Sequence, residues 1–479
     1  MNENIERTVH LEWKEPNASY DVIIIGGGIS GLSAAWKLSE HGYDTHVIES
    51  DDQIGGLAKS IKIDNYILDI GPHSFFTEDK EIYDKIVGLF KGEESAIPYS
   101  KRSVKMYFRG KYVDYPLSVK SVLFQMGVTS SILSTLSFVK SYISSLSKKN
   151  QLEKKELTVE EWAIENFGKY FFFNFFKPYT EQFWKIKTDE LSHRVIPSSK
   201  KMDFAKTLKH LLIKKYLEIS RREPGKLSLI ERESLPSYYP EKGFGEIANR
   251  IGKEILKNNG KIFTNCKAEK IYFNDNSIKV ETNKKDFFGD YIISTIPLNN
   301  LIKKINPNAP SSVVECSQKL EYLCLVLVYI ITKKKSVIDC QYCYYINKPY
   351  NRISEMNYFS EKTSPENENL LSIEISCHHN DEMWNLNNQK IFDTCMRSIE
   401  EDGLLNKNEV IDFKVVKVPN VYPIYRKDYD KNLTEVNIFL KKTKNFYSIG
   451  RQGQFYYGDI DQMARFGFDT ATEIIKEKK

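Results

Sequence analysis

The chain has 479 residues, of which 41% are apolar and 28% charged, and 69 basic against 64 acidic side chains leave a formal net charge of +5. This composition is typical of a soluble globular protein, and so small a charge argues against a nucleic-acid partner. The length predicts two joined domains. The seven cysteines, an odd number scattered from Cys266 to Cys395, argue against a disulfide framework and favour a reducing, cytoplasmic compartment.

The N-terminal tail, residues 1–19, is polar and carries acidic residues, so we expect neither a signal peptide nor a transit peptide. No long uninterrupted apolar run predicts a transmembrane segment. The segment Ser121–Leu146 mixes apolar residues with serines and Lys140. We expect it to form a helix packed on its own domain, with peripheral membrane contact as the alternative. Nothing in the sequence specifies an oligomeric state.

The first predicted element is a buried strand that ends in a glycine-rich turn. Val22–Ile25 is apolar and β-branched, and the fingerprint Gly26-x-Gly28-x-x-Gly31 follows it. Gly26 permits the tight turn, Gly28 lets backbone N–H groups approach a pyrophosphate, and Gly31 lets helix and sheet pack closely. The helix that begins near Ile29 and Ser30 adds partial positive charge at the phosphates.

A second strand, Thr45–Ile48, ends at Glu49, 18 residues after Gly31. A carboxylate at this position can accept hydrogen bonds from an adenosine ribose. The order of strand, turn, helix, strand and acid predicts a dinucleotide site, against the alternative of a turn that is glycine-rich only for packing. Ser50 and a second glycine pair, Gly55-Gly56, with Leu57 behind it, follow the acid.

The order of fingerprint, acid and Gly-Gly pair resembles the FAD-binding N-terminus of the amine oxidase and protoporphyrinogen oxidase superfamily. The resemblance implies FAD in place of NAD, and it implies further contacts with the cofactor from Ser50, Gly55, Gly56 and Leu57. It also implies an α/β fold, with a Rossmann-like FAD-binding domain of the glutathione-reductase type and an inserted mixed α+β substrate domain. We expect the FAD-binding domain to be discontinuous, formed by residues 20–80, 236–300 and 415–479. The substrate domain would comprise a mainly helical segment, 81–235, and a strand-rich segment, 301–414.

Later elements in chain order support this organisation. A strand at Tyr66–Ile70 runs into the turn Gly71-Pro72-His73, where a loop can reach a cofactor. Asp290–Pro297 is a buried strand that places Thr295 at its carboxyl end. We also expect strands at Leu320–Thr332 and Leu370–Cys377, and a final strand that runs from Phe446 into Gly450-Arg451, followed by a closing helix.

Three segments resemble the bacterial UDP-galactopyranose mutases. They are the loop around Gly71-Pro72-His73, the motif Tyr179-Thr180-Glu181 with Trp184, and the ending Gly450-Arg451…Tyr457…Asp459-Ile460-Asp461. The resemblance implies that Arg451 contacts the flavin diphosphate and that Asp459, Ile460 and Asp461 belong to the same cofactor-binding motif. It also implies that Tyr457 and Asp459 lie near the substrate, which makes them catalytic candidates. Tyr179 and Trp184 would line the same cleft.

The chain departs from the mutases at Leu323, where their corresponding strand carries an arginine that clamps the sugar-nucleotide diphosphate. Loss of such a charged clamp typically costs about 2–5 kcal/mol of binding. Other segments resemble bacterial FAD oxidoreductases of the protoporphyrinogen-oxidase-like and amine-oxidase-like group. The aromatic run Tyr170–Phe176 could stack a planar substrate, although core packing explains it equally well.

These features favour an FAD-dependent oxidoreductase that transfers a hydride from an amine, a porphyrinogen or a sugar derivative to flavin N5. His73 is the expected positioning or proton-transfer group, and Lys59 is a second candidate base. The alternatives are a non-redox sugar-nucleotide mutase of the UDP-galactopyranose mutase type and a non-catalytic flavoprotein. We expect no metal site, since Cys340-x-x-Cys343 has neither a second pair nor a histidine set beside it.

Overall fold

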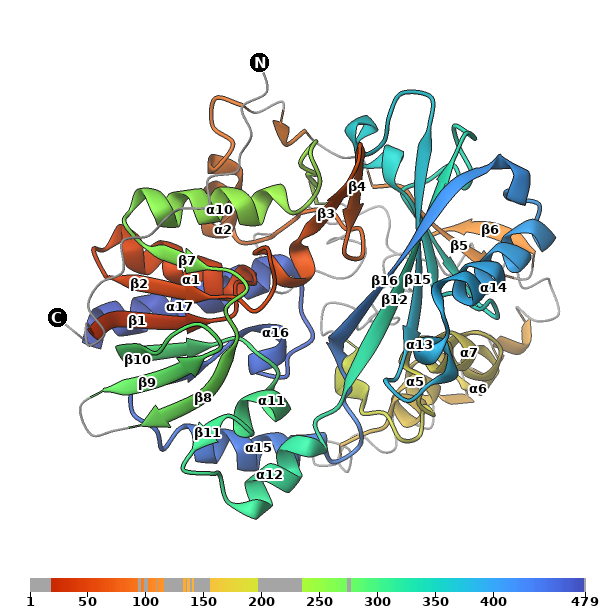
Figure 1. Cartoon of the computed structure of the whole chain (residues 1–479). Helices are drawn as coiled ribbons and strands as arrows, with labels where there is room; N and C mark the ends of the chain where they lie inside the picture. The colour runs from red at the N-terminus through yellow and green to blue at the C-terminus, as the bar shows by residue number, and fades with distance from the viewer. Residues whose placement is uncertain are drawn as a thin grey trace, which may run out of the picture.

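The computed structural model of the protein describes residues 19–93, 96–98, 102–108, 110–115, 132–134, 136–137, 140–141, 156–196, 235–273 and 277–477. It is a mixed α/β fold with two large sheets that lie side by side, each covered by helices (Figure 1). The short hairpin of β3 (Ser60–Ile63) and β4 (Tyr66–Asp69) lies between them.

The first sheet has the strand order β11-β8-β9-β10-β1-β2-β7, and β17 pairs with β10. Its strands are β1 (Ser19–Ile25), β2 (Thr45–Ile48), β7 (Lys261–Phe263), β8 (Ala268–Phe273), β9 (Ile278–Thr282), β10 (Phe287–Ser294), β11 (Ile305–Asn306) and β17 (Phe446–Ser448). β1 is parallel to both β2 and β10. Val22, Ile23 and Ile24 are fully buried, as a continuous apolar run predicts for a strand covered on both faces.

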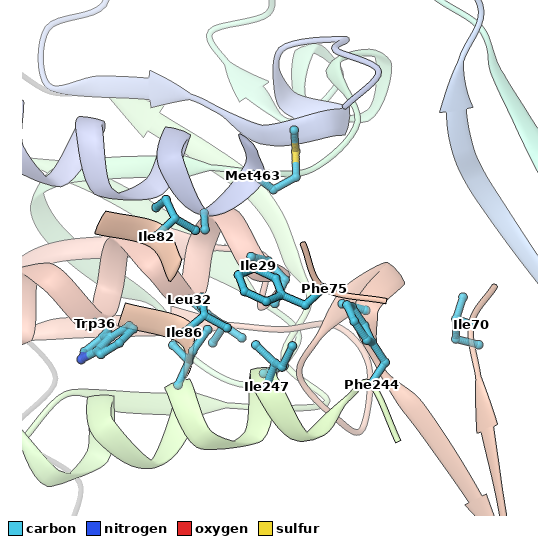
Figure 2. Packing of buried hydrophobic residues seen from close by; sticks show 14 of the residues in the cluster. Ile29, Leu32, Trp36, Ile70, Phe75, Ile82, Ile86, Phe244, Ile247 and Met463 are labelled. Atoms are coloured by element: carbon cyan, nitrogen blue, oxygen red, sulfur yellow. The ribbon is translucent and has the colours of Figure 1, made fainter. Parts of the chain in front are cut away.

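Helix α1 (Ile29–Glu40) contacts α10 (Glu246–Lys257) and α17 (Ile460–Glu477). Figure 2 shows Leu32 and Trp36 of α1 beside Ile82 of α2 (Lys80–Gly88) and Ile247 of α10. α17 approaches α1 so closely that a Cβ on Gly467 would lie 2.4 Å from the Ser30 carbonyl oxygen. This core fixes the N-termini of α1 and α17 relative to the first sheet.

The second sheet has the order β16-β12-β15-β14-β13-β5-β6. Its strands are β5 (Val104–Phe108), β6 (Lys111–Asp114), β12 (Tyr322–Thr332), β13 (Tyr342–Tyr345), β14 (Arg352–Glu355), β15 (Asn369–Cys377) and β16 (Val410–Pro423). Every residue of β12 and β15 is buried, which agrees with their predicted β-branched density. Helix α14 (Asn388–Glu401) contacts β16.

The remaining helices of the described ranges are α5 (Val159–Phe167), α6 (Lys169–Phe171), α7 (Lys177–Trp184), α11 (Leu298–Ile302), α12 (Ser311–Gln318), α13 (Glu382–Asn385), α15 (Tyr429–Leu440) and α16 (Gly450–Gly453). A π-helical turn, η4 (Phe172–Phe176), joins α6 to α7. Within these ranges, no helix combines the length and apolar character that a membrane crossing requires. Ser121–Leu146 lies largely outside the described residues.

Sheet membership differs from the expected segment boundaries in three places. β5 and β6, from the segment expected to be mainly helical, join the second sheet. β16 also joins this sheet, although the FAD-binding segment was expected to begin at residue 415, and β11 extends the first sheet beyond residue 300. β16 pairs with β12, which is about 90 residues earlier in the chain, so composition alone could not assign it.

Candidate active site

A cavity of about 680 Å³ lies between the carboxyl ends of β1, β2 and β10 and the facing strands of the second sheet. Such a volume is within the roughly 300–1,000 Å³ of ligand and cofactor pockets. The predicted residues that line it are Gly26, Gly28, Ile29, Ser30, Glu49, Ser50, Gly55, Gly56, Leu57, Gly71, His73, Thr295, Gly450, Arg451, Tyr457, Asp459 and Ile460. They come from five separate parts of the chain.

The three fingerprint glycines have different surroundings. Gly26 has a φ of +106°, and a Cβ on it would lie 2.1 Å from Thr295 Oγ1. A Cβ on Gly31 would lie 2.2 Å from the Gly26 carbonyl oxygen, so Gly31 serves the contact between helix and turn. A Cβ on Gly28 would meet no atom within 4 Å. Gly28 is therefore the position at which the backbone is open to the cavity, as an approaching pyrophosphate requires.

Glu49 organises the loop around it. Its Oε2 accepts a hydrogen bond from Gly27 N–H at 2.7 Å, and its Oε1 accepts from Asp51 N–H at 2.8 Å and from the Ser50 hydroxyl at 3.1 Å. The carboxylate lines the cavity at the end of β2 and is 9% exposed. Glu49 therefore lies at the end of β2 and at the cavity, where the sequence predicts an acid.

The second glycine pair packs directly on the first loop. Gly55 N–H donates to the Gly27 carbonyl oxygen at 2.7 Å, and a Cβ on Gly56 would lie 3.2 Å from Gly28 Cα. Both residues of the pair have positive φ, +115° for Gly55 and +56° for Gly56. The pair closes over the fingerprint, which explains why glycines recur after the acid.

The C-terminal motif reaches the same cavity through α16 and the start of α17. A Cβ on Gly450, whose φ is +85°, would lie 2.7 Å from Ser30 Oγ. The Arg451 guanidinium donates to the Gly458 carbonyl and lies 5.7 Å from the ring centres of both Tyr422 and Tyr457. α1 and α17 thus both begin at the cavity, where helix N-termini favour anionic groups.

His73 lies between this glycine-lined side of the cavity and the second sheet. Its Nδ1 hydrogen-bonds the Gly71 carbonyl oxygen, and its ring centre lies 4.0 Å from that of Phe244. Burial, with a smaller contribution from the charges of Arg352 and Arg451, lowers the pKa of His73 to about 4, although the hydrogen bond to Gly71 opposes the shift. The ring is therefore neutral at neutral pH. We expected a pKa suited to proton transfer, but burial and two distant arginines are not visible in the local sequence.

Sequence reasoning missed several cavity residues. The second sheet contributes Tyr342, Tyr344, Arg352 and Tyr422, the ends of its hairpin β5–β6 contribute Arg102 and Tyr115, and the His73 loop contributes Phe76. Arg352 of β14 donates to Glu374 Oε1 through Nε at 2.8 Å and to the Pro72 carbonyl through Nη2 at 3.0 Å. Its guanidinium also lies 4.9 Å from the Tyr342 ring centre. The paired strands β14 and β15, with Arg352 opposite Glu374, create this buried ion pair. No motif in the sequence marks it.

Five predicted residues do not line the cavity: Gly31, Pro72, Asp461, Tyr179 and Trp184. Asp461 is buried in the first turn of α17, where it accepts from the Thr77 hydroxyl at 3.0 Å. Tyr179 and Trp184 lie behind wall residues, with ring centres 6.2 Å from Tyr344 and 5.7 Å from Tyr457.

Three other sequence features have a structural explanation. The Leu323 side chain is fully buried in a core cluster and lies outside the cavity lining. Lys59 lines the cavity but forms an ion pair with Asp51. None of the aromatic residues of Tyr170–Phe176 lines the cavity, and Phe172 and Phe175 are buried in small core clusters. Among the described residues, no group of three or more His, Cys, Asp or Glu side chains could hold a metal ion.

A glycine-lined cavity at the carboxyl ends of parallel strands, which opens onto a second, aromatic-rich sheet, is the arrangement expected of an enzyme that holds a nucleotide cofactor next to a small-molecule substrate. The family model for flavin containing amine oxidoreductases matches residues 29–435, and the chain belongs to this family. It is therefore an FAD enzyme.

Individual relatives are more distant. The chain is 33% identical to coproporphyrinogen III oxidase of Propionibacterium freudenreichii over 22% of its own length and 21% of that protein. It is 29% identical to protoporphyrinogen oxidase 2 of Arabidopsis thaliana over 31% of its length and 29% of that protein. These matches span less than a third of either relative. A solved structure of reduced UDP-galactopyranose mutase superposes with a TM-score of 0.78 at 19% identity, covering 96% of both chains, and so shares the fold.

Proposed function

We propose that this enzyme transfers a hydride from a small organic donor to the N5 atom of FAD. The observation that carries the proposal is the single cavity in which the glycine loops of the first sheet face the tyrosines and Arg352 of the second. A cofactor held by the first wall would expose its reactive end to a donor held by the second. Bound FAD supplies an acceptor for two electrons and one proton.

The residues of the first wall have the chemistry that FAD needs. Gly26–Ser30 and Gly55–Leu57 would hold the pyrophosphate, with Thr295 supporting the turn at Gly26. Glu49, with Ser50 beside it, would hold the adenosine ribose. Gly450, Arg451, Asp459 and Ile460 would complete the site, because a guanidinium and a helix N-terminus both favour phosphate. We propose that these segments form a Rossmann-like domain of the glutathione-reductase type, built from residues 20–80, 236–300 and 415–479 apart from β16.

The neutral His73 is proposed to position the donor and to accept a hydrogen bond at Nε2, since Nδ1 is engaged by Gly71. Tyr457 and Asp459 line the same cavity as His73 and would orient the substrate. Tyr179 and Trp184 would act one layer further out, by supporting Tyr344 and Tyr457. Water exclusion would come from the aromatic rings of the second sheet.

A non-redox mutase acting on a sugar nucleotide is the second candidate. The buried Leu323 shows no cationic clamp at that position, but Arg352 offers a guanidinium on the cavity wall from a different strand. An arginine can bind a diphosphate through its planar fork of donors. Arg352 could therefore replace the missing cation in a mutase.

The deciding experiment is anaerobic. Protein loaded with FAD is mixed in a stopped-flow instrument with a primary amine, a porphyrinogen or a sugar alcohol, and the flavin absorbance is followed. Bleaching by one donor class supports hydride transfer and identifies that class. In parallel, dithionite-reduced protein is incubated with UDP-galactopyranose. Formation of UDP-galactofuranose while the flavin stays reduced would establish the mutase, and a protein that takes up no FAD would contradict both functions.

A further inference from the structure

Asp69 is a fully buried carboxylate just before the loop that carries His73. Its Oδ1 accepts from the Ser60 hydroxyl at 2.6 Å and from Phe244 N–H at 3.1 Å, and its Oδ2 accepts from the Tyr239 hydroxyl at 2.6 Å. Burial raises the pKa of Asp69, and these three hydrogen bonds oppose the rise. A buried carboxylate needs such partners, because without them desolvation disfavours its charge.

The backbone around Phe244 fits Asp69 and Ser60 closely. Gly243 has a φ of +91°, and a Cβ on it would lie 2.4 Å from Ile67 Cγ2. A Cβ on Gly245 would lie 2.5 Å from the Ser60 backbone nitrogen, while Gly245 N–H donates to Ser60 Oγ at 2.7 Å. The sequence Gly243-Phe244-Gly245 therefore places the Phe244 backbone on Asp69 and fixes the direction of its side chain.

The Phe244 ring in turn contacts the His73 ring, with 4.0 Å between ring centres. In Figure 2 the Phe244 side chain lies between Ile247 and Ile70, beside Phe75. The same loop is held on its far side by paired backbone hydrogen bonds between Phe75 and Tyr238, both 2.8 Å. The Asp69 carbonyl oxygen also accepts from the Tyr329 hydroxyl of β12 at 2.7 Å. Asp69 thus joins β3, the segment before α10 and the second sheet.

We propose that Asp69 is a positioning residue for His73 and acts through Phe244. Its carboxylate holds the backbone of Phe244, and the Phe244 ring holds the imidazole at the cavity wall. The catalytic importance of His73 rests on the proposed function, whereas the contacts from Asp69 to His73 do not. Asp69 itself does not line the cavity, so it touches neither cofactor nor substrate.

The test measures the reactivity of the His73 imidazole with diethyl pyrocarbonate, followed at that residue by peptide mass spectrometry. This readout needs no flavin and no substrate. Asp69→Asn replaces one oxygen by an amide group that cannot accept, so one buried donor loses its partner. We expect His73 to be labelled roughly fivefold faster or more, the factor that corresponds to about 1 kcal/mol at 298 K.

The matched control is Glu355→Gln. Glu355 is also fully buried and also accepts from three donors, Val337 N–H, Ile338 N–H and Asn369 Nδ2, but none of its partners contacts His73. We expect this variant to lose stability without changing the labelling of His73. Tyr239→Phe removes only the hydroxyl that donates to Asp69 Oδ2, and it replaces Asp69→Asn in the test if that variant does not fold. We expect it to raise the labelling rate of His73 by a smaller factor than Asp69→Asn.

Phe244→Leu separates positioning from general loosening. It keeps the backbone N–H that Asp69 accepts but removes the ring against His73. We expect it to accelerate labelling, and we expect Asp69→Asn to add little in this background, since coupled residues are not additive. The proposal would be overturned if His73 were labelled at the same rate in Asp69→Asn and Glu355→Gln. It would also be overturned if Asp69→Asn accelerated the labelling of His73 as much in the Phe244→Leu background as in the parent. Failure of the protein to bind FAD would be seen separately and would bear only on the proposed function.

Discussion

Gly28 offers the sharpest test of the cofactor site. A side chain at this position should weaken FAD binding without destabilising the fold. Its φ of −76° and ψ of 174° are open to any L-residue, and its Cβ would meet no atom within 4 Å. Gly28→Val should therefore fold with a free energy of unfolding within about 0.5 kcal/mol of the parent. The new side chain would instead occupy the space through which the pyrophosphate reaches the backbone.

The expected loss of FAD affinity follows from the contact that is blocked. One hydrogen bond from a backbone N–H to a charged phosphate is worth about 1.5–3 kcal/mol, which corresponds to roughly a 10- to 150-fold increase in Kd. Titration of the flavin-free protein with FAD, followed by quenching of flavin fluorescence, gives the Kd. Urea unfolding of the same flavin-free samples gives the stability.

Two further glycines serve as controls. Gly26→Ala should unfold more easily by at least about 1 kcal/mol, because its φ is +106° and the new Cβ would lie 2.1 Å from Thr295 Oγ1. Gly88→Ala, on α2 and also without a neighbour within 4 Å, should leave the Kd for FAD unchanged and raise the free energy of unfolding by up to about 1 kcal/mol, because alanine has the higher helix propensity. An unchanged Kd for FAD in Gly28→Val would refute the assignment of this glycine to the phosphate site.

Three more predictions follow from the same geometry. Arg352→Leu should destabilise the protein by about 3–5 kcal/mol by leaving Glu374 buried without its cation; adding Glu374→Leu should restore part of this in urea unfolding, and a purely additive loss would contradict the pairing. Because the pKa of His73 falls from 6.5 to about 4 on folding, the unfolded chain binds the extra proton, so stability should decline as pH falls from 6.5 to 4, by at most about 1.4 kcal/mol per pH unit. His73→Gln should flatten this difference between unfolding curves at pH 5 and 7, and an identical slope would show that His73 is not the group. Gly467→Val should lower Tm by several degrees, since its Cβ would lie 2.4 Å from the Ser30 carbonyl oxygen; a Tm equal to that of the parent would mean that α1 and α17 separate freely.

The glycine-lined wall of the cavity was largely predictable because its parts are encoded locally. Gly26, Gly55 and Gly450 all have positive φ, a backbone conformation that a side chain disfavours and that therefore leaves glycine in the sequence. Glu49 was predictable because a strand of known length ends at it. Such features depend on a few neighbouring residues, and a pattern of residue types can report them.

The wall that the second sheet contributes was not predictable, because the pairing of its strands decides which side chains reach the cavity. Arg352 and Glu374 meet only because β14 and β15 pair in one register, and a shift by one residue would turn Arg352 to the other face. Leu323 occupies the position at which the mutases carry a diphosphate-binding arginine, but its side chain is buried in the core and does not reach the cavity. The pairing of β12 with β16 is irregular between Leu323 and Leu325, and Leu325 is the residue that lines the cavity.

The sequence by itself therefore determined the class of cofactor, the buried strands around it and the loop that bears His73. Only the tertiary structure decided the protonation of His73, the arginines whose charges act on it and the contacts that join it to Asp69 through Phe244. The physical reason is the range of the interactions involved. Backbone conformation is set by adjacent residues, whereas burial and charge at His73 arise from Arg352, Arg451 and Phe244, which are more than 170 positions away in the chain.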